Sequence, residues 1–143
     1  MTLYLDTSSL FKLYVEEPGS DDVRQELSEA SAGATSLVTY AEARAAFARV
    51  RRLGSITAAG LRSVKRDFES DWSIYVIIPP SDAICRSAGD LAERYGLRGF
   101  DSIHLATFLH LANNDPSEVR FSSFDHDLSR AAIRAVRAAR RSG

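Results

Sequence analysis

The chain has 143 residues, a formal net charge of −1 at pH 7, 45% hydrophobic residues and 26% charged residues. This composition excludes a disordered chain, and the near-neutral charge argues against a simple basic coat for nucleic acid. No apolar run approaches the roughly 20 residues of a membrane helix, the N-terminus lacks a signal-peptide pattern, and the single cysteine, Cys85, excludes an internal disulfide. We therefore expect one cytoplasmic domain over residues 1–143 without membrane association, and Cys85 as a small buried residue.

The apolar pattern along the chain predicts short strands separated by helices. In chain order we expect a strand at 2–6, helices at 7–14 and 21–30, a strand at 36–38, helices at 40–53 and 57–72, a strand at 73–78, helices at 81–95 and 100–113, a turn at 114–116, a strand at 119–124 and a last helix from about 127. A parallel crossover needs a dozen or more residues, usually helical. The order therefore predicts an α/β domain with a central, mostly parallel sheet of four to five strands flanked by helices.

Four acidic residues lie next to short apolar segments. Asp6 and Asp125 directly follow strands, and Glu42 is expected in the first turn of the helix after the second strand. Asp101 lies in the first turn of another helix, where an N-cap role alone would explain it. One cap does not explain four acids, and functional sites in parallel sheets form outside the carboxyl ends of the strands. The pattern predicts that the four carboxylates share one site.

The helix that begins near Phe100 is apolar on all sides, which predicts a position inside the molecule. His104 lies one turn beyond Asp101, so it is a candidate metal ligand, although a histidine in an apolar helix is more often a packing residue. His126, beside Asp125, is expected in an exposed loop.

Carboxylates that converge to about 5 Å repel by about 3 kcal/mol per ionised pair at an effective dielectric near 20. Four of them cannot all remain charged and unpaired, so either protons or a divalent cation must compensate. Oxygen ligands without cysteine favour Mg²⁺ or Mn²⁺, and such a cation activates water and neutralises a phosphoryl oxygen. We therefore predict phosphodiester hydrolysis at a metal site formed by Asp6, Glu42, Asp101 and Asp125.

Hydroxyl side chains lie close to two of these acids. Ser8 and Ser123 are each two residues from an acid and are candidates to orient a carboxylate or a metal-bound water. Helix capping by Ser8 and edge-strand polarity of Ser123 explain these residues equally well. Asp127 is expected to cap the last helix.

Basic residues are unevenly distributed. Seven lie between residues 43 and 66 and five arginines lie between residues 128 and 143, and neither stretch contains an acid. Taken alone, such charge runs are more often solvated helix faces than binding sites. The candidates for phosphate contacts are Arg44, Arg49, Arg51, Arg130 and Arg134.

Four segments together resemble the PIN-domain ribonucleases, in particular the VapC toxins of bacterial and archaeal toxin–antitoxin pairs. The segments are Leu3-Tyr4-Leu5-Asp6-Thr7-Ser8, the region of Glu42, Phe100-Asp101-Ser102-Ile103-His104-Leu105-Ala106 and Ser123-Phe124-Asp125-His126-Asp127-Leu128. The resemblance spans essentially the whole chain in the expected order. It implies a three-layer PIN-like domain.

The resemblance also implies an activity and partners. It implies a Mg²⁺- or Mn²⁺-dependent endoribonuclease in which Asp6, Glu42, Asp101 and Asp125 are the acidic metal site and Ser123 is the small hydroxyl residue before the last acid. Such toxins are usually homodimers, and a VapB-type antitoxin blocks the acidic pocket. The basic residues named above would then bind the RNA phosphates around the site.

Two other classes of protein remain open. A receiver or dehalogenase-like phosphotransfer domain also has an acid after its first strand, but position 8 is serine where a dehalogenase needs a second acid. A receiver needs an acid after its third strand, where this chain has Pro79-Pro80. The other alternative is a non-enzymatic RNA-binding or interaction module in which the acids are only helix caps.

Overall fold

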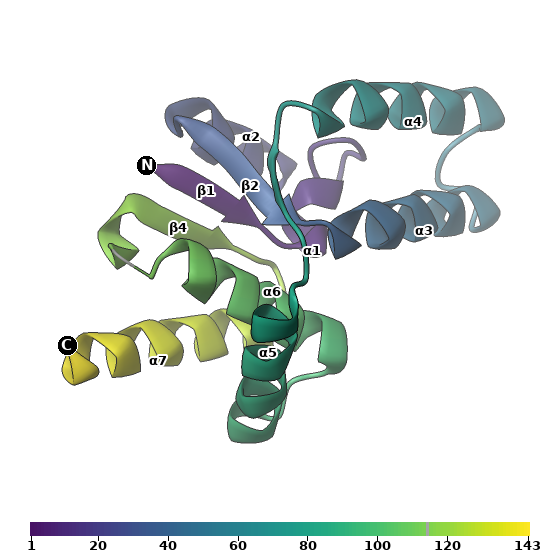
Figure 1. Cartoon of the computed structure of the whole chain (residues 1–143). Helices are drawn as coiled ribbons and strands as arrows, with labels where there is room; N and C mark the ends of the chain where they lie inside the picture. The colour runs from purple at the N-terminus through teal and green to yellow at the C-terminus, as the bar shows by residue number, and fades with distance from the viewer. Residues whose placement is uncertain (114) are drawn as a thin grey trace.

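A parallel sheet separates two layers of helices in the computed structural model, which describes residues 1–113 and 115–143 (Figure 1). The described strands are β1 (Thr2–Leu5), β2 (Ala32–Ser36), β3 (Val76–Ile78) and β4 (Val119–Ser122), in the order β3-β2-β1-β4. The helices are α1 (Thr7–Phe11), α2 (Ser20–Glu29), α3 (Val38–Arg52), α4 (Ala58–Trp72), α5 (Asp82–Tyr95), α6 (Gly99–Leu111) and α7 (His126–Ser142), with a short 3₁₀ helix at Pro116–Glu118. The predicted three-layer α/β class is confirmed.

The alternation of β1 determines which layer covers each face of the sheet. Leu3 and Leu5 are fully buried against a cluster that includes residues of α1, α2, α3 and α4. Tyr4 points to the opposite face and packs in a cluster formed mainly by α6 and α7. Each layer thus buries alternate residues of the same central strand, because successive side chains of a β-strand point to opposite faces of the sheet.

The register of β1 and β4 brings two distant segments together. Leu5 pairs with Ser122, and the Asp6 N–H donates a hydrogen bond of 3.1 Å to the Ser122 carbonyl. The two strands therefore end at the same level. As a result, residues 6–8 and 123–125 lie side by side at the carboxyl edge of the sheet.

The strand predictions were wrong in their boundaries. The second strand is β2 rather than residues 36–38, and α3 already begins at Val38, so Glu42 lies in its second turn and not in its first. The third strand covers only three of the six predicted residues, since Ile74 is 77% exposed and pairs with no strand. β-Branched composition suggested a longer strand, but strand length depends on the available partner.

Three smaller expectations also need correction or a limit. Cys85 is exposed rather than buried, because Ile84 and Ala88 are the residues of α5 that pack against α6. The strand predicted over 119–124 ends at Ser122, and the helix predicted over 7–14 ends at Phe11. Part of the turn expected at 114–116 lies outside the described residues.

Helices α3 and α4 form a hairpin that projects away from the sheet (Figure 1). The Thr57 hydroxyl caps α4 by accepting a hydrogen bond of 3.0 Å from the Gly60 N–H. Across residues 1–113 and 115–143, no helix combines the length and the apolar character that crossing a membrane requires.

Candidate active site

The Asp6 carboxylate lies at the end of β1 and is only 4% exposed. Its Oδ1 accepts hydrogen bonds from the Ser8 hydroxyl at 2.7 Å and from the Ser9 N–H at 2.9 Å, and its Oδ2 accepts one from the Ser123 hydroxyl at 2.5 Å. Burial raises the pKa of Asp6, and the three hydrogen bonds oppose this rise. The hydrogen bonds therefore fix the orientation of the Asp6 side chain, and burial makes its ionised form less favourable.

The two serines proposed from the sequence both contact Asp6, so capping or edge-strand polarity does not describe them. The Ser8 hydroxyl also accepts a hydrogen bond of 3.0 Å from the Phe124 N–H. The Ser123 hydroxyl accepts one of 3.1 Å from the Asp125 N–H. The pair thus connects the segment after β1 to the segment after β4.

Glu42 is oriented by a buried chain of hydrogen bonds. Its Oε1 lies 2.9 Å from Nε2 of His104 and accepts a hydrogen bond of 2.7 Å from the Thr7 hydroxyl. The other ring nitrogen of His104 lies 2.9 Å from the Tyr4 hydroxyl. Burial strongly raises the pKa of Tyr4, so this hydroxyl keeps its proton and donates to Nδ1. With Nδ1 accepting from Tyr4, Nε2 is the ring nitrogen that donates to Glu42.

His104 is consequently neither a simple packing residue nor a metal ligand in this structure. It is 2% exposed, and both ring nitrogens are engaged by Tyr4 and Glu42. Burial raises the pKa of Glu42, but hydrogen bonds from His104 and Thr7, together with the charge of Arg98, lower the pKa overall. Glu42 is thus an ionised carboxylate with one oxygen engaged.

Arg98, which the sequence analysis did not identify, lies between the other two acids. Its Nε donates to Asp101 Oδ2 at 3.0 Å, and its Nη2 lies 3.7 Å from Asp125 Oδ2. Arg98 is the N-cap residue of α6, and Asp101 lies in the first turn, so Asp101 is not the cap. The sequence did contain a signal for this ion pair, because Arg98 and Asp101 are three residues apart at the start of a predicted helix.

Asp125 caps α7, contrary to the expectation that Asp127 does so. Asp125 Oδ1 accepts a hydrogen bond of 2.9 Å from the Leu128 N–H. Asp127 lies in the first turn, where it forms an ion pair with Arg130 at 2.5 Å. His126 is exposed, as predicted, but it is the first residue of α7 and not part of a loop.

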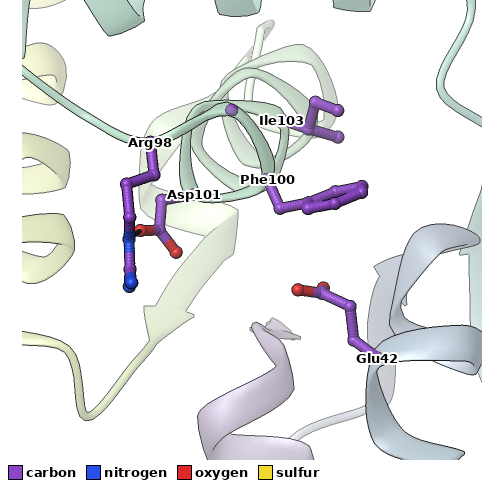
Figure 2. Close-up of a pocket in the computed structure, with 6 residues that line it drawn as sticks. Glu42, Arg98, Phe100, Asp101 and Ile103 are labelled. Atoms are coloured by element: carbon purple, nitrogen blue, oxygen red, sulfur yellow. Dashed lines mark hydrogen bonds and ion pairs between the residues drawn. The ribbon is translucent and has the colours of Figure 1, made fainter. Parts of the chain in front are cut away.

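A pocket of about 560 Å³ opens between α3 and the first turn of α6 (Figure 2). Its polar lining comes from Glu42, Asp101 and Arg98, and its apolar lining comes from Phe100 and Ile103. Figure 2 shows Arg98 beside Asp101, with Glu42 across the pocket. Asp6 lies outside the lining and is connected to it through Ser123 and then Asp125, which contacts the lining residue Arg98.

The donor set suits a hard divalent cation, but it is not arranged as a closed metal site. Within residues 1–113 and 115–143, no group of three or more His, Cys, Asp and Glu side chains is arranged to hold a metal ion. The expected convergence of all four carboxylates in one coordination sphere is therefore absent from the described structure. Arg98 instead supplies positive charge to Asp101 and Asp125.

The candidate phosphate-binding arginines lie in different environments. Arg49 and Arg51 are exposed on the projecting hairpin. Arg44 Nη1 forms an ion pair of 3.2 Å with Glu69, Arg130 pairs with Asp127, and the Arg134 guanidinium lies 5.2 Å from the centre of the Tyr95 ring.

The fold and the acidic edge of the sheet define a class of protein. The PIN domain family model matches residues 3–134, and the chain belongs to this family. Its membership confirms the resemblance seen in the sequence and excludes the receiver and dehalogenase-like alternatives.

Individual relatives give a narrower comparison. Ribonuclease VapC45 of Mycobacterium tuberculosis (strain CDC 1551 / Oshkosh) and Ribonuclease VapC49 of Mycobacterium tuberculosis (strain ATCC 25618 / H37Rv) are each 33% identical to this chain over 117 residues, which is 82% of this chain and 80% of each relative.

Solved structures share the fold at lower identity. A chain of FitAcB from Neisseria gonorrhoeae has a TM-score of 0.67 at 18% identity, covering 92% of this chain and 93% of its own. A chain of a toxin–antitoxin complex from Klebsiella pneumoniae has a TM-score of 0.62 at 20% identity, covering 86% of each chain. A chain of VapBC2 from Rickettsia felis bound to a promoter DNA fragment has a TM-score of 0.56 at 13% identity, covering 87% of this chain and all of its own.

The hydrogen bonds of His104 yield a stability prediction. We expect His104→Phe to lower the free energy of unfolding by about 2 kcal/mol, because the buried Tyr4 hydroxyl loses its partner. Tyr4→Phe should cost less, and the double variant should cost clearly less than the sum of the two single variants. Urea unfolding of the four proteins measures this coupling, and strictly additive losses would contradict it.

The raised pKa of Asp6 yields a second prediction. Between the unfolded and the folded pKa the native state binds more protons than the unfolded state, so this group's contribution to stability falls as pH rises through that window. We expect Asp6→Asn to raise the melting temperature at pH 7 in EDTA, by about 4 °C for each kcal/mol gained. The gain should shrink as pH falls through the raised pKa of folded Asp6 and should be lost below the ordinary aspartate pKa of about 3.9. Asp90→Asn, at an exposed position of α5, is the control and should change the melting temperature little.

Proposed function

We propose that this PIN-domain protein is a divalent-metal-dependent endoribonuclease and the toxin of a type II toxin–antitoxin pair. The observation that carries the proposal is the set of four carboxylates at the carboxyl edge of the sheet, three of which are joined by direct contacts through Ser123 and Arg98. The relatives at 33% identity are named as VapC ribonucleases, which supports the same activity.

The proposed metal ligands are Asp6, Glu42, Asp101 and Asp125, and the proposed ion is Mg²⁺ or Mn²⁺. When bound, the ion supplies charge for a phosphoryl oxygen and lowers the pKa of a bound water. Ser8 and Ser123 keep the Asp6 carboxylate in one orientation, and His104 and Thr7 do the same for Glu42. Asp101 pairs with an exposed arginine, so it can exchange that partner for a cation without unfolding the core.

The proposed partners are RNA as the substrate and a VapB-type antitoxin as the inhibitor. Two of the structures that share the fold are described as a toxin–antitoxin complex and as VapBC2, which supports an antitoxin partner. A homodimer is part of the proposal, as is action in the cytoplasm, where the RNA is.

RNA phosphates are proposed to contact Arg44, Arg49, Arg51, Arg130 and Arg134. Arg49 and Arg51 are the strongest candidates, because both are exposed on the projecting hairpin. Arg44 and Arg130 must first exchange their ion pairs with Glu69 and Asp127. Exchange of a surface ion pair costs little, so these two residues stay in the proposal.

RNA cleavage and metal binding test the proposal together. We expect the purified protein to cleave RNA with Mn²⁺ and not with EDTA, and Asp6→Asn and Asp101→Asn to lower the rate at least 100-fold while remaining folded. Mn²⁺ should raise the melting temperature of the wild type, as ligand at about 100 times Kd adds about 2.7 kcal/mol. This rise should be smaller in Asp101→Asn. A folded wild-type protein that binds RNA but never cleaves it would favour the non-enzymatic alternative.

The salt dependence of RNA binding tests the arginines of the hairpin. Each phosphate contact to single-stranded RNA contributes about −0.7 to the slope of log K against log salt concentration. We therefore expect Arg49→Gln/Arg51→Gln to reduce the steepness of this slope by roughly 1.4. Arg24→Gln on α2, which removes an arginine paired with Asp21, is the matched control. An unchanged slope would make Arg49 and Arg51 part of a solvated face.

A further inference from the structure

The exposed ring of Phe100 is the feature of the pocket that the metal site does not explain. Phe100 is 56% exposed, whereas the residues of α6 that follow it, Ser102 and His104–Phe108, are buried. The sequence predicted that this aromatic residue lies inside the molecule. None of the aromatic pairs found among the described residues includes Phe100. The phenylalanines of the two hydrophobic cores, in contrast, each pack against another phenylalanine. An unpaired apolar ring beside an acidic site suggests a ligand with an aromatic face.

The two sides of the pocket differ in chemistry. Phe100 and Ile103 form an apolar wall, and the Phe100 ring extends to the side away from Arg98 (Figure 2). Arg98 is the cation of the lining, and its side chain is 82% exposed. Asp101 follows Phe100 in the sequence and contacts Arg98 directly. A ligand that spans the pocket therefore meets an apolar ring, a carboxylate and a guanidinium.

One nucleotide of single-stranded RNA has the complementary parts. A base stacks on an aromatic ring whatever its identity, and a guanidinium binds a phosphate in a bidentate geometry. Bases inside an A-form duplex have no free face, so stacking on Phe100 needs an unpaired base.

We propose, on the basis of the proposed function, that this pocket binds one unpaired nucleotide of the RNA, with its base stacked on Phe100 and its phosphate bound by Arg98. Arg98 has two alternative partners, the carboxylates in the free protein and the phosphate in the complex. Binding of RNA thereby removes Arg98 from Asp101 and Asp125 and frees their oxygens.

Base deletion in the RNA tests the stacking directly. The site of cleavage is first mapped with the wild type, and binding is then measured by fluorescence anisotropy in the Asp6→Asn background, whose cleavage is expected to be at least 100-fold slower. A labelled single-stranded RNA is compared with copies in which one base at a time is replaced by hydrogen while the backbone is kept. With Phe100 present, one of these deletions should weaken binding about tenfold, within the range for base stacking on aromatic residues.

Variants of Phe100 separate stacking from apolar contact. In Asp6→Asn/Phe100→Leu the same base deletion should change the affinity less than twofold, and Phe100→Trp should restore the tenfold effect. Phe124→Leu is the matched control, because its ring is also exposed, is contacted by Lys12 and lies outside the pocket lining. Arg98→Gln should weaken all the RNA copies by the same factor. An RNA duplex of the same sequence should bind more weakly than the single strand.

Three results would overturn the proposal. Equal base-deletion effects in the Asp6→Asn protein and in Asp6→Asn/Phe100→Leu would show that the base does not stack there. A loss of antitoxin binding in Phe100→Leu with unchanged RNA binding would assign the pocket to a protein partner instead. If the wild type cleaves no RNA, the proposed function fails and this inference fails with it, whereas normal cleavage without base coupling rejects the inference alone.

Discussion

The buried carboxylate of Asp6 is the constraint on which the site depends. A charge that is almost fully removed from water is tolerated only where hydrogen bonds replace its hydration. Here two of the donors come from the segment after β1 and the third is Ser123, from the segment after β4. The parallel register of the two strands brings those segments to one level. The carboxylate thus locks together two parts of the chain that are more than 100 residues apart.

The rest of the site is built in two parts of different rigidity. Glu42 is held by Thr7 and by His104, whose second nitrogen is anchored on the buried Tyr4 hydroxyl of β1. Asp101 and the exposed Arg98 form the open part, at the first turn of α6. The Glu42 half is fixed by buried hydrogen bonds, and the Arg98–Asp101 ion pair balances part of the negative charge of the open half. In the proposed function, a bound cation or an RNA phosphate replaces this ion pair. The Glu42 half is anchored on β1 and α6, and the open half lies at the start of α6.

Much of this arrangement was predictable because each acid follows a recognisable local signal. Asp6 and Asp125 end apolar strands, and Asp101 begins an apolar helix, so their approximate places follow from short-range patterns. Strand boundaries were less predictable. The β-branched residues around Ile74 favoured a long strand, but β3 extends only where β2 offers a partner. The second strand was also misplaced, so the predicted start of α3 was too late. Glu42 therefore lies in the second turn of α3 and not in the first.

The sequence by itself determined the α/β class and the family, and it supplied the four acids of the proposed site, because these inferences depend on local periodicity and on the order of short motifs. Only the tertiary structure decided which side chains neutralise and orient those acids. Arg98 became a counterion of Asp125, and His104 a link between Tyr4 and Glu42, through contacts between residues 27 to 100 positions apart. Such contacts depend on strand register and helix packing, to which no local pattern refers. The exposure of Phe100 was also decided by the tertiary structure. An apolar side chain favours burial in general, but the sequence does not show whether a neighbouring element is there to cover it.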